Sequence, residues 1–147
     1  MTSRRWQTAR CVAFFVFALL AFMQPVRAVE VIVNSKVATI RLTNMEIRAI
    51  FTMRLRNWPD GSRITVFVLD DNAPAQVEFA KTIMDMFPYQ LRRYWDRLVF
   101  SGTGQAPTEV HSLAEMHDLV ASTPGAIGYL GADQIDEKVR VVKVGNP

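Results

Sequence analysis

Cysteine is almost absent from this sequence of 147 residues, in which Cys11 is the single example. We expect Cys11 to be removed with an N-terminal segment, so the remaining chain has no disulfide framework and must be held together by packing. Long apolar runs are also scarce. The one such run, Cys11–Met23, is too short to serve as a stable membrane anchor, and no second run follows it.

The first 28 residues have the pattern of an export signal. Arginines precede the apolar run, and Val26–Ala28 provides small residues at the expected cleavage position. A twin-arginine signal is the alternative, but Gln7 replaces the apolar residue expected after the arginines, so general secretion is favoured. We therefore expect a signal peptide at 1–28, one domain at 29–147, and a periplasmic or secreted product.

Acidic residues are missing from the predicted signal, and this changes how the net charge is interpreted. Residues 1–28 contain four of the 17 basic residues and none of the 14 acidic ones, so 13 basic and 14 acidic residues remain. The remaining chain is close to neutral, with a net charge of −1 rather than the +3 of the whole sequence. Its charge therefore gives no support to nucleic acid or anionic membrane as a partner.

Strand and helix patterns alternate along residues 29–147. Apolar and alternating runs predict strands at Val29–Asn34, Ile64–Leu69, Ala126–Leu130 and Val139–Val144. Capping boxes and helical spacing predict helices that begin near Thr43, Pro74, Gln90 and Ser112. This order predicts a single α/β domain with a mostly parallel sheet flanked by helices.

Four short motifs occur in an order that resembles the second lobe of the phosphate-binding proteins of ABC transporters. They are Ile50-Phe51, "NWPDG" at Asn57–Gly61, Ile64–Val66, and "TPGAIGY" at Thr123–Tyr129. The resemblance covers nearly all of Val29–Val144. It implies a single three-layer lobe of the type 2 periplasmic binding protein fold, and a substrate-binding protein with phosphate as its ligand.

The same resemblance shows where the anion loop of that family should lie. The family has an Arg-x-Asp-Gly-Ser-Gly-Thr segment after this strand, at the start of a helix. Here Leu69 stands at the arginine, Asp71 at the aspartate, Asn72 at the first glycine, and Ala73–Ala75 at Ser-Gly-Thr. Most anion donors are therefore missing, and the carboxylates of Asp70 and Asp71 disfavour a dianion. We expect one of these carboxylates or Asn72 to cap the helix.

The segment "SGTG" at Ser101–Gly104 is a second candidate anion loop, because bare backbone N–H groups can cradle a phosphate. However, it follows a predicted helix rather than a strand, and Pro107 stands where the third glycine of a GxGxxG pattern would be. A flexible connection between two helices is the favoured interpretation, and a relocated anion loop is the alternative. The candidate ligand-binding residues are Ser101, Gly102, Thr103, Gly104, Asp71 and Asn72.

No pattern of catalytic residues emerges, and we expect neither enzyme activity nor a cofactor. His111 and His117 would point to different faces of one helix, and no third residue has metal-site spacing. Lys81, Arg92, Arg93 and Arg97 could form a basic face, although a solvated helix surface is the simpler interpretation. The aromatic side chains of Trp58, Tyr94 and Trp95 are expected in the core.

Two functions from different classes therefore remain. One is a solute-binding module, such as a sensor or transport accessory, that handles phosphate or another small oxyanion. The other is a protein-interaction module that has kept the lobe and lost the ligand. Without the family's partner lobe, the loops at 70–75 and 100–107 would lie open, which favours a homodimer or another protein partner.

Overall fold

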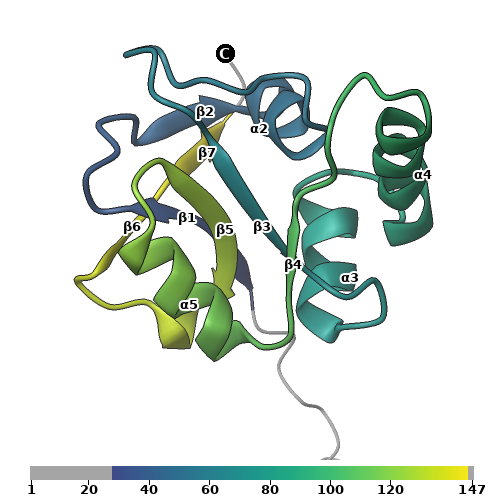
Figure 1. The fold of residues 1–147 in the computed structure, drawn as a ribbon. Coiled ribbons are helices and arrows are strands. Elements are labelled where there is room, and N and C mark those ends of the chain that lie inside the picture. The colour runs from purple at the N-terminus through teal and green to yellow at the C-terminus, as the bar shows by residue number, and fades with distance from the viewer. Residues whose placement is uncertain (1–27, 146–147) are drawn as a thin grey trace, which may run out of the picture.

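The computed structural model describes residues 28–145 (Figure 1). The predicted signal peptide, except for Ala28, lies outside the described residues. The elements in chain order are β1 (Val29–Asn34), β2 (Arg41–Thr43), α2 (Asn44–Phe51), β3 (Thr65–Leu69), α3 (Pro74–Thr82), α4 (Pro88–Phe100), β4 (Thr108–Val110), α5 (Leu113–Ser122), β5 (Ala126–Gly131), the 3-10 helix η1 (Ala132–Gln134), β6 (Val139–Val141) and β7 (Lys143–Gly145). No helix in this part of the chain is long and apolar enough to cross a membrane.

The central sheet has five strands in the order β4-β3-β5-β1-β6. Strand β3 pairs in parallel with both β4 and β5, whereas β1 is antiparallel to both of its neighbours, β5 and β6. Four strands of this sheet therefore run in one direction and β1 opposes them, which confirms a mostly parallel sheet. Strands β2 and β7 form a separate parallel pair.

The predicted element order was wrong in several places, and strand β2 was not predicted at all. The segment after α4 leads into the short strand β4 rather than directly into a helix, and β4 is held by its register with β3, which pairs Phe67 with Thr108 and Leu69 with Val110. The predicted last strand is two strands, because β6 ends at Val141 and β7 begins at Lys143. Between them, the Val142 N–H donates to the Val31 carbonyl at 2.9 Å.

The starts of α2 and α5 follow local sequence signals. At α2 the capping box is complete, because the Glu46 N–H donates to Thr43 Oγ1 at 3.2 Å and the Thr43 N–H donates to Glu46 Oε2 at 2.8 Å. At α5 only half of the predicted box forms. Ser112 Oγ accepts the Glu115 N–H at 3.1 Å, but the Glu115 carboxylate accepts the N–H of His111 instead of that of Ser112.

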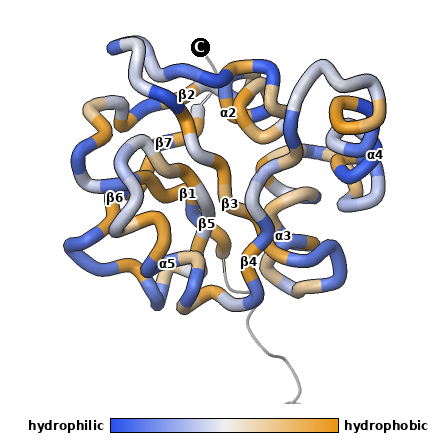
Figure 2. The backbone as a smooth tube through the Cα atoms, viewed as in Figure 1, coloured by the Kyte–Doolittle hydropathy of each residue, from blue (hydrophilic) through white to orange (hydrophobic). Residues whose placement is uncertain are grey.

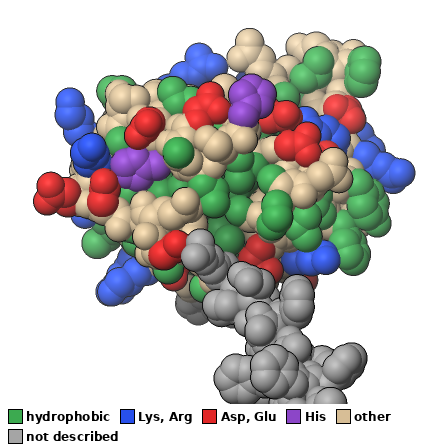
Figure 3. Space-filling view, turned by 90° about the horizontal axis from the view of Figure 1, so that it is seen from below, with side chains coloured by type: hydrophobic (Ala, Val, Ile, Leu, Met, Phe, Trp, Pro, Cys, Tyr) green, Lys and Arg blue, Asp and Glu red, His purple; other side chains and the backbone are tan. Residues whose placement is uncertain are grey.

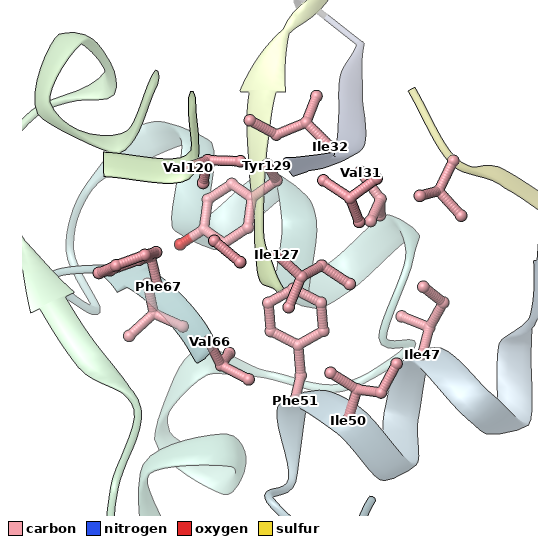
Figure 4. Packing of buried hydrophobic residues seen from close by; sticks show 14 of the residues in the cluster. Val31, Ile32, Ile47, Ile50, Phe51, Val66, Phe67, Val120, Ile127 and Tyr129 are labelled. Atoms are coloured by element: carbon pink, nitrogen blue, oxygen red, sulfur yellow. The ribbon is translucent and has the colours of Figure 1, made fainter. Parts of the chain in front are cut away.

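Strand β5 shows how helices cover both faces of the sheet. The ring of Tyr129 stacks on Phe79 of α3 with centroids 4.2 Å apart and lies 6.2 Å from the ring of Phe51 of α2. Gly128 points the other way, where an added Cβ would lie 2.5 Å from Met116 Sδ of α5. Helices α2 and α3 thus cover one face and α5 covers the other. Figure 4 shows the packing of Tyr129 and Phe51, and Figure 2 shows hydrophobic residues concentrated in the central strands.

Helix α4 packs against this core through one apolar face, which contributes Leu91 and Trp95 to it. Trp95 is buried, and its Nε1 donates to the Phe51 carbonyl at 2.8 Å. Trp58, between α2 and β3, is buried too, and its Nε1 donates to the Gly125 carbonyl at 3.0 Å. Both tryptophans are core residues, as predicted. The prediction for Tyr94 was wrong, because this side chain lies on the exposed side of α4.

Candidate functional site

The parallel strands β3 and β4 give the sheet two chemically different ends. We call residues 69–76 and 109–112, together with Arg92, the carboxyl edge, because they gather where β3 and β4 end. We call residues 53–66 and 101–108 the amino edge, because they precede these strands or form their starts. In α/β sheets, ligands usually bind outside the carboxyl ends of parallel strands.

The six candidate ligand-binding residues do not form one site. Asp71 and Asn72 lie at the carboxyl edge, directly after β3, whereas Ser101–Gly104 lie at the amino edge, between α4 and the start of β4. The length of the strands separates the two groups. The two groups are therefore two separate candidate sites, and each has different residues around it.

A guanidinium held between two carboxylates dominates the carboxyl edge. Arg92 Nε lies 2.9 Å from Asp71 Oδ2, Arg92 Nη2 lies 3.0 Å from Asp71 Oδ1, and the same Nη2 lies 3.0 Å from Glu109 Oε2. The hydrogen bonds with Asp71, and secondly with Glu109, raise the pKa of Arg92 above its usual range. Seen from below, red acidic side chains are prominent around this edge (Figure 3). Its central cation is thus already neutralised.

This arrangement also corrects the predicted basic face of α4. Arg92 lies over the ring of Trp95, 5.1 Å from its centroid, and faces Asp71, so it is separated from the exposed residues Arg93 and Arg97. The ion pair joins residues that are far apart in sequence. The sequence offered no local signal for it, although Asp71 itself was a candidate.

The start of α3 has no side-chain cap, contrary to expectation. The residue before the helix is Ala73, and Pro74 occupies the first turn without an N–H group. Asp70 Oδ1 accepts the N–H of Asn72 at 2.9 Å, while Asp71 is committed to Arg92. The carboxylates therefore organise the loop rather than the helix terminus.

A buried polar network lies next to this helix start. The Leu69 N–H donates to the hydroxyl of Tyr129 at 2.8 Å, and that hydroxyl donates to Oε1 of Gln76, whose side chain is fully buried. Burial raises the pKa of Tyr129 above its usual range, so the hydroxyl remains protonated. Gln76 Nε2 is buried without a hydrogen-bond partner within residues 28–145. Such an unpaired donor costs about 1–3 kcal/mol and was not predicted from the sequence.

At the amino edge, the segment Ser101–Gly104 terminates α4. The N–H groups of Ser101, Gly102, Thr103 and Gly104 donate to the carbonyls of Arg97, Val99, Leu98 and Leu98, respectively. Gly102 has a φ of 68°, the left-handed conformation that commonly ends a helix at glycine. Ser101 Oγ and Thr103 Oγ1 lie 2.8 Å apart and bond to each other. These hydrogen bonds favour a connecting segment over an anion loop.

The two histidines do not lie on one helix, because His111 precedes α5 whereas His117 lies within it. His117 on α5 lies between two carboxylates, with Nε2 2.9 Å from Asp136 Oδ1 and Nδ1 3.1 Å from Asp118 Oδ1. These hydrogen bonds, that with Asp136 first, raise the pKa of His117. Within the described residues, no group of three or more His, Cys, Asp or Glu side chains could hold a metal ion.

Solved structures of phosphate-transport receptors share this fold. No family model matches the sequence. An ABC-type phosphate transport receptor from Vibrio cholerae is 16% identical, with a TM-score of 0.62, over 79% of this chain and 45% of that chain. A putative phosphate ABC transporter substrate-binding protein from Clostridium perfringens, solved with bound phosphate, is 20% identical, with a TM-score of 0.61, over 79% and 44%.

PstS from Borrelia burgdorferi gives a similar result, with 16% identity and a TM-score of 0.61 over 80% of this chain and 47% of that chain. The present chain thus spans less than half the length of these structures. The resemblance inferred from the four sequence motifs is confirmed at the level of the fold. The chain has the fold of a single lobe of a phosphate ABC transporter substrate-binding protein.

Proposed function

We propose that this chain is an exported protein-recognition module, in which a lobe of the phosphate-binding fold presents a partner-binding surface. In this proposal, residues 1–28 direct export and residues 29–147 form the recognition domain, without catalytic activity. The observation that carries the proposal is the outer face of α4, defined as Phe87, Tyr89, Arg93, Arg97 and Phe100.

The outer face of α4 is exposed and unusually aromatic. The relative exposure is 88% for Phe100, 57% for Tyr89 and 50% for Phe87. Tyr89, Arg93, Arg97 and Phe100 follow one another at spacings of four or three residues, so they share one side of the helix. Covering large apolar side chains that are gathered on a surface lowers the free energy, so such a surface favours the binding of a partner.

The contacts within this face are suited to a partner surface. Phe87 and Tyr89 stack with centroids 5.7 Å apart, and the guanidinium of Arg93 lies 5.8 Å from the Tyr89 centroid. These contacts reduce the freedom of the side chains before any partner arrives. Tyrosine, phenylalanine and arginine are also enriched at the centres of protein interfaces. In the view from below, green and blue side chains gather on the side of α3 and α4 (Figure 3).

The carboxyl edge supports the same proposal, because its charges disfavour phosphate binding. A phosphate receptor needs donors whose charge is available to the anion. Here Arg92 is paired with Asp71 and Glu109, and Asp70 adds a further carboxylate to the loop. An arriving phosphate dianion would be repelled by these carboxylates and would have to compete with them for Arg92.

Binding of phosphate or another small oxyanion at the carboxyl edge is the second candidate function. The unpaired Nε2 of Gln76 favours it, because this unused donor lies in the first turn of α3, and a helix N-terminus favours negative charge. The Clostridium perfringens structure, which contains bound phosphate, shares the fold. Under this alternative, the chain would serve as a sensor or accessory of transport.

Photo-crosslinking in the producing cells tests the recognition proposal. A benzophenone amino acid placed at Tyr89 or at Phe100 should give a crosslinked product of defined mass. The same group at Met45, which is 79% exposed on α2, is the matched control and should give none. A product of twice the mass of the chain would identify a second copy as the partner.

A second substitution makes the crosslinking experiment specific. Phe100→Ser should abolish the product formed from Tyr89, because it removes the most exposed aromatic side chain of the same face. Absence of products at both α4 positions would contradict the proposal. Products that are equally strong at Met45 would contradict it as well, since they would indicate unspecific contact.

A further inference from the structure

A hollow at the amino edge differs in chemistry from the carboxyl edge, and no residue of the outer face of α4 is among the described residues that line it. It has a volume of about 580 Å³ and lies between the residues that follow α2, the first part of β3 and the segment after α4. We call it the arginine pocket, because Arg56 and Arg63 are the two charged residues that line it. Its volume is in the usual range for small-molecule sites.

The wall of the arginine pocket combines apolar surface with positive charge. Met53, Leu55, Ile64 and Val66 provide the apolar part, and no aspartate or glutamate of the described part of the chain lines the hollow. Within residues 28–145, neither Arg56 nor Arg63 forms an ion pair with a carboxylate. Two like charges at one hollow repel each other, and an anion placed between them would relieve that repulsion.

The backbone brings the two arginines to the same place. The Ile64 N–H donates to the Arg56 carbonyl at 2.8 Å, and Asn57 pairs with Arg63 across the turn between them. Gly125 packs closely against this turn, because an added Cβ there would lie 2.2 Å from the Arg63 carbonyl oxygen. The "NWPDG" motif therefore has a structural consequence, since its turn places Arg56 and Arg63 at one rim.

Hydrogen bonds hold the guanidinium of Arg56 before any ligand is present. Its Nε donates to the Met53 carbonyl at 3.2 Å, and its Nη2 donates to the Thr103 carbonyl at 3.1 Å. An added Cβ at Gly104 would lie 2.7 Å from that Nη2, so glycine allows the close approach. These two bonds use part of the five N–H donors of the guanidinium and leave the others available.

We propose that the arginine pocket binds a small anionic ligand with an apolar body, whose carboxylate or phosphate monoester pairs with Arg56 and Arg63. The apolar body lies against Met53, Leu55 and the first residues of β3. The segment Ser101–Gly104 contributes a wall and a carbonyl that orients Arg56, rather than N–H donors. This site is additional to the protein-recognition function and uses none of the α4 outer face.

The test is a titration of the full chain with phenyl phosphate and, separately, with phenylacetate, followed by ¹H–¹⁵N NMR. We expect saturable shift changes in residues 53–66 and 102–105 with at least one of the two probes, and the probe that binds more tightly identifies the preferred head group. Benzyl alcohol lacks the charge and inorganic phosphate lacks the apolar body, so each should bind about ten-fold more weakly.

Substitutions then assign the binding to the two arginines. Arg63→Gln should weaken the tighter probe by about ten-fold, as expected for the loss of a charge-assisted hydrogen bond. Gly104→Ala should also weaken it, because the new methyl group displaces the Arg56 guanidinium. Arg41→Gln, an exposed position on β2 outside the pocket, makes the same charge change and should leave binding unaltered.

Several results would overturn the proposal. One is the absence of saturable shifts with both anionic probes. Another is equal binding of benzyl alcohol, which would show that charge is not recognised. Unchanged affinity in Arg63→Gln would exclude the arginine as a ligand contact, and shifts confined to residues 69–76 would place any binding at the carboxyl edge.

Discussion

The two edges of the sheet use the same side chain, arginine, in opposite ways. At the carboxyl edge, Arg92 is bonded to Asp71 and Glu109, so its charge stabilises the fold. At the amino edge, Arg56 is oriented by backbone carbonyls, and Arg63 has no side-chain hydrogen bond within residues 28–145. Carbonyl oxygens orient a guanidinium and leave its charge uncompensated, whereas carboxylates orient it and also neutralise its charge. The comparison shows that the partners of an arginine, rather than its presence, decide whether an anion can use it.

The largest effect on stability should come from Gly125→Ala, which would displace the backbone of the amino edge. Gly125 has a φ of 74°, and the new Cβ would lie 2.2 Å from the Arg63 carbonyl oxygen, so the backbone must move. We expect the free energy of unfolding to fall by more than about 2 kcal/mol, measured by urea denaturation.

Gly61→Ala is the matched control for this prediction. Gly61 has a φ of 87°, but no atom lies within 4 Å of an added Cβ. Only the conformational cost of about 1–2 kcal/mol remains for alanine there. Equal destabilisation by both substitutions would show that the contact between Gly125 and Arg63 does not determine the geometry of the amino edge.

A smaller effect should follow from opening the cluster at the carboxyl edge with Asp71→Asn. The side chains of Arg92 and Asp71 are 32% and 28% exposed, so solvent screens the pair only in part. We expect a loss of about 1 kcal/mol in the free energy of unfolding.

Asp85→Asn provides the comparison for that ion pair. Asp85 contacts Arg48 at 3.2 Å, but its side chain is 85% exposed, and asparagine tolerates its φ of 51°. The change should be within about 0.5 kcal/mol. If Asp71→Asn had no larger effect than Asp85→Asn, the cluster around Arg92 would not be a structural element.

The smallest effect concerns pH, because His117 is a second cation held by two carboxylates and, unlike Arg92, it titrates near neutrality. Its pKa is raised above 6.5 in the folded state, mainly by Asp136 and then by Asp118. The folded state therefore binds this proton more tightly than the unfolded state does. The resulting stability is fully present below about pH 6.5 and is lost as pH rises through the raised pKa.

Thermal unfolding between pH 6 and pH 8 measures this contribution. The melting temperature should fall with rising pH more steeply in the wild type than in His117→Gln. His111→Gln is the control, because the His111 side chain has no hydrogen-bond partner among the described residues. A pH dependence that is identical in the wild type and His117→Gln would show that the pair with Asp136 does not influence stability.

Much of the fold could be predicted because its signals are local. The capping box of Thr43 and Glu46 needs only residues three apart, and the apolar run Ile64–Leu69 indicates a buried strand by itself. Strand β4 was missed because Thr108–Val110 is short and contains one buried residue. Its identity as a strand depends on pairing with β3, which no local pattern encodes.

The candidate site was predicted less well, because its chemistry depends on distant partners. Asp71 and Asn72 were placed correctly at the end of a strand, but the partner of Asp71 is Arg92, which lies 21 residues further along the chain. The buried bond between Tyr129 and Gln76 joins residues 53 apart. Spacing could indicate neither contact. The arginine pocket was missed for the same reason. Arg56 and Arg63 are candidate ligands only because no carboxylate of the described residues pairs with them, and this depends on the fold.

Titration of the full chain with inorganic phosphate, followed by calorimetry at fixed ionic strength, tests most directly whether the carboxyl edge has lost its anion chemistry. Because Asp71 and Glu109 occupy Arg92, we predict no saturable heat at phosphate concentrations up to about 1 mM. A saturable 1:1 isotherm with a dissociation constant on the order of micromolar, lost in Arg92→Gln and retained in Arg63→Gln, would contradict this account and restore the carboxyl edge as a phosphate site.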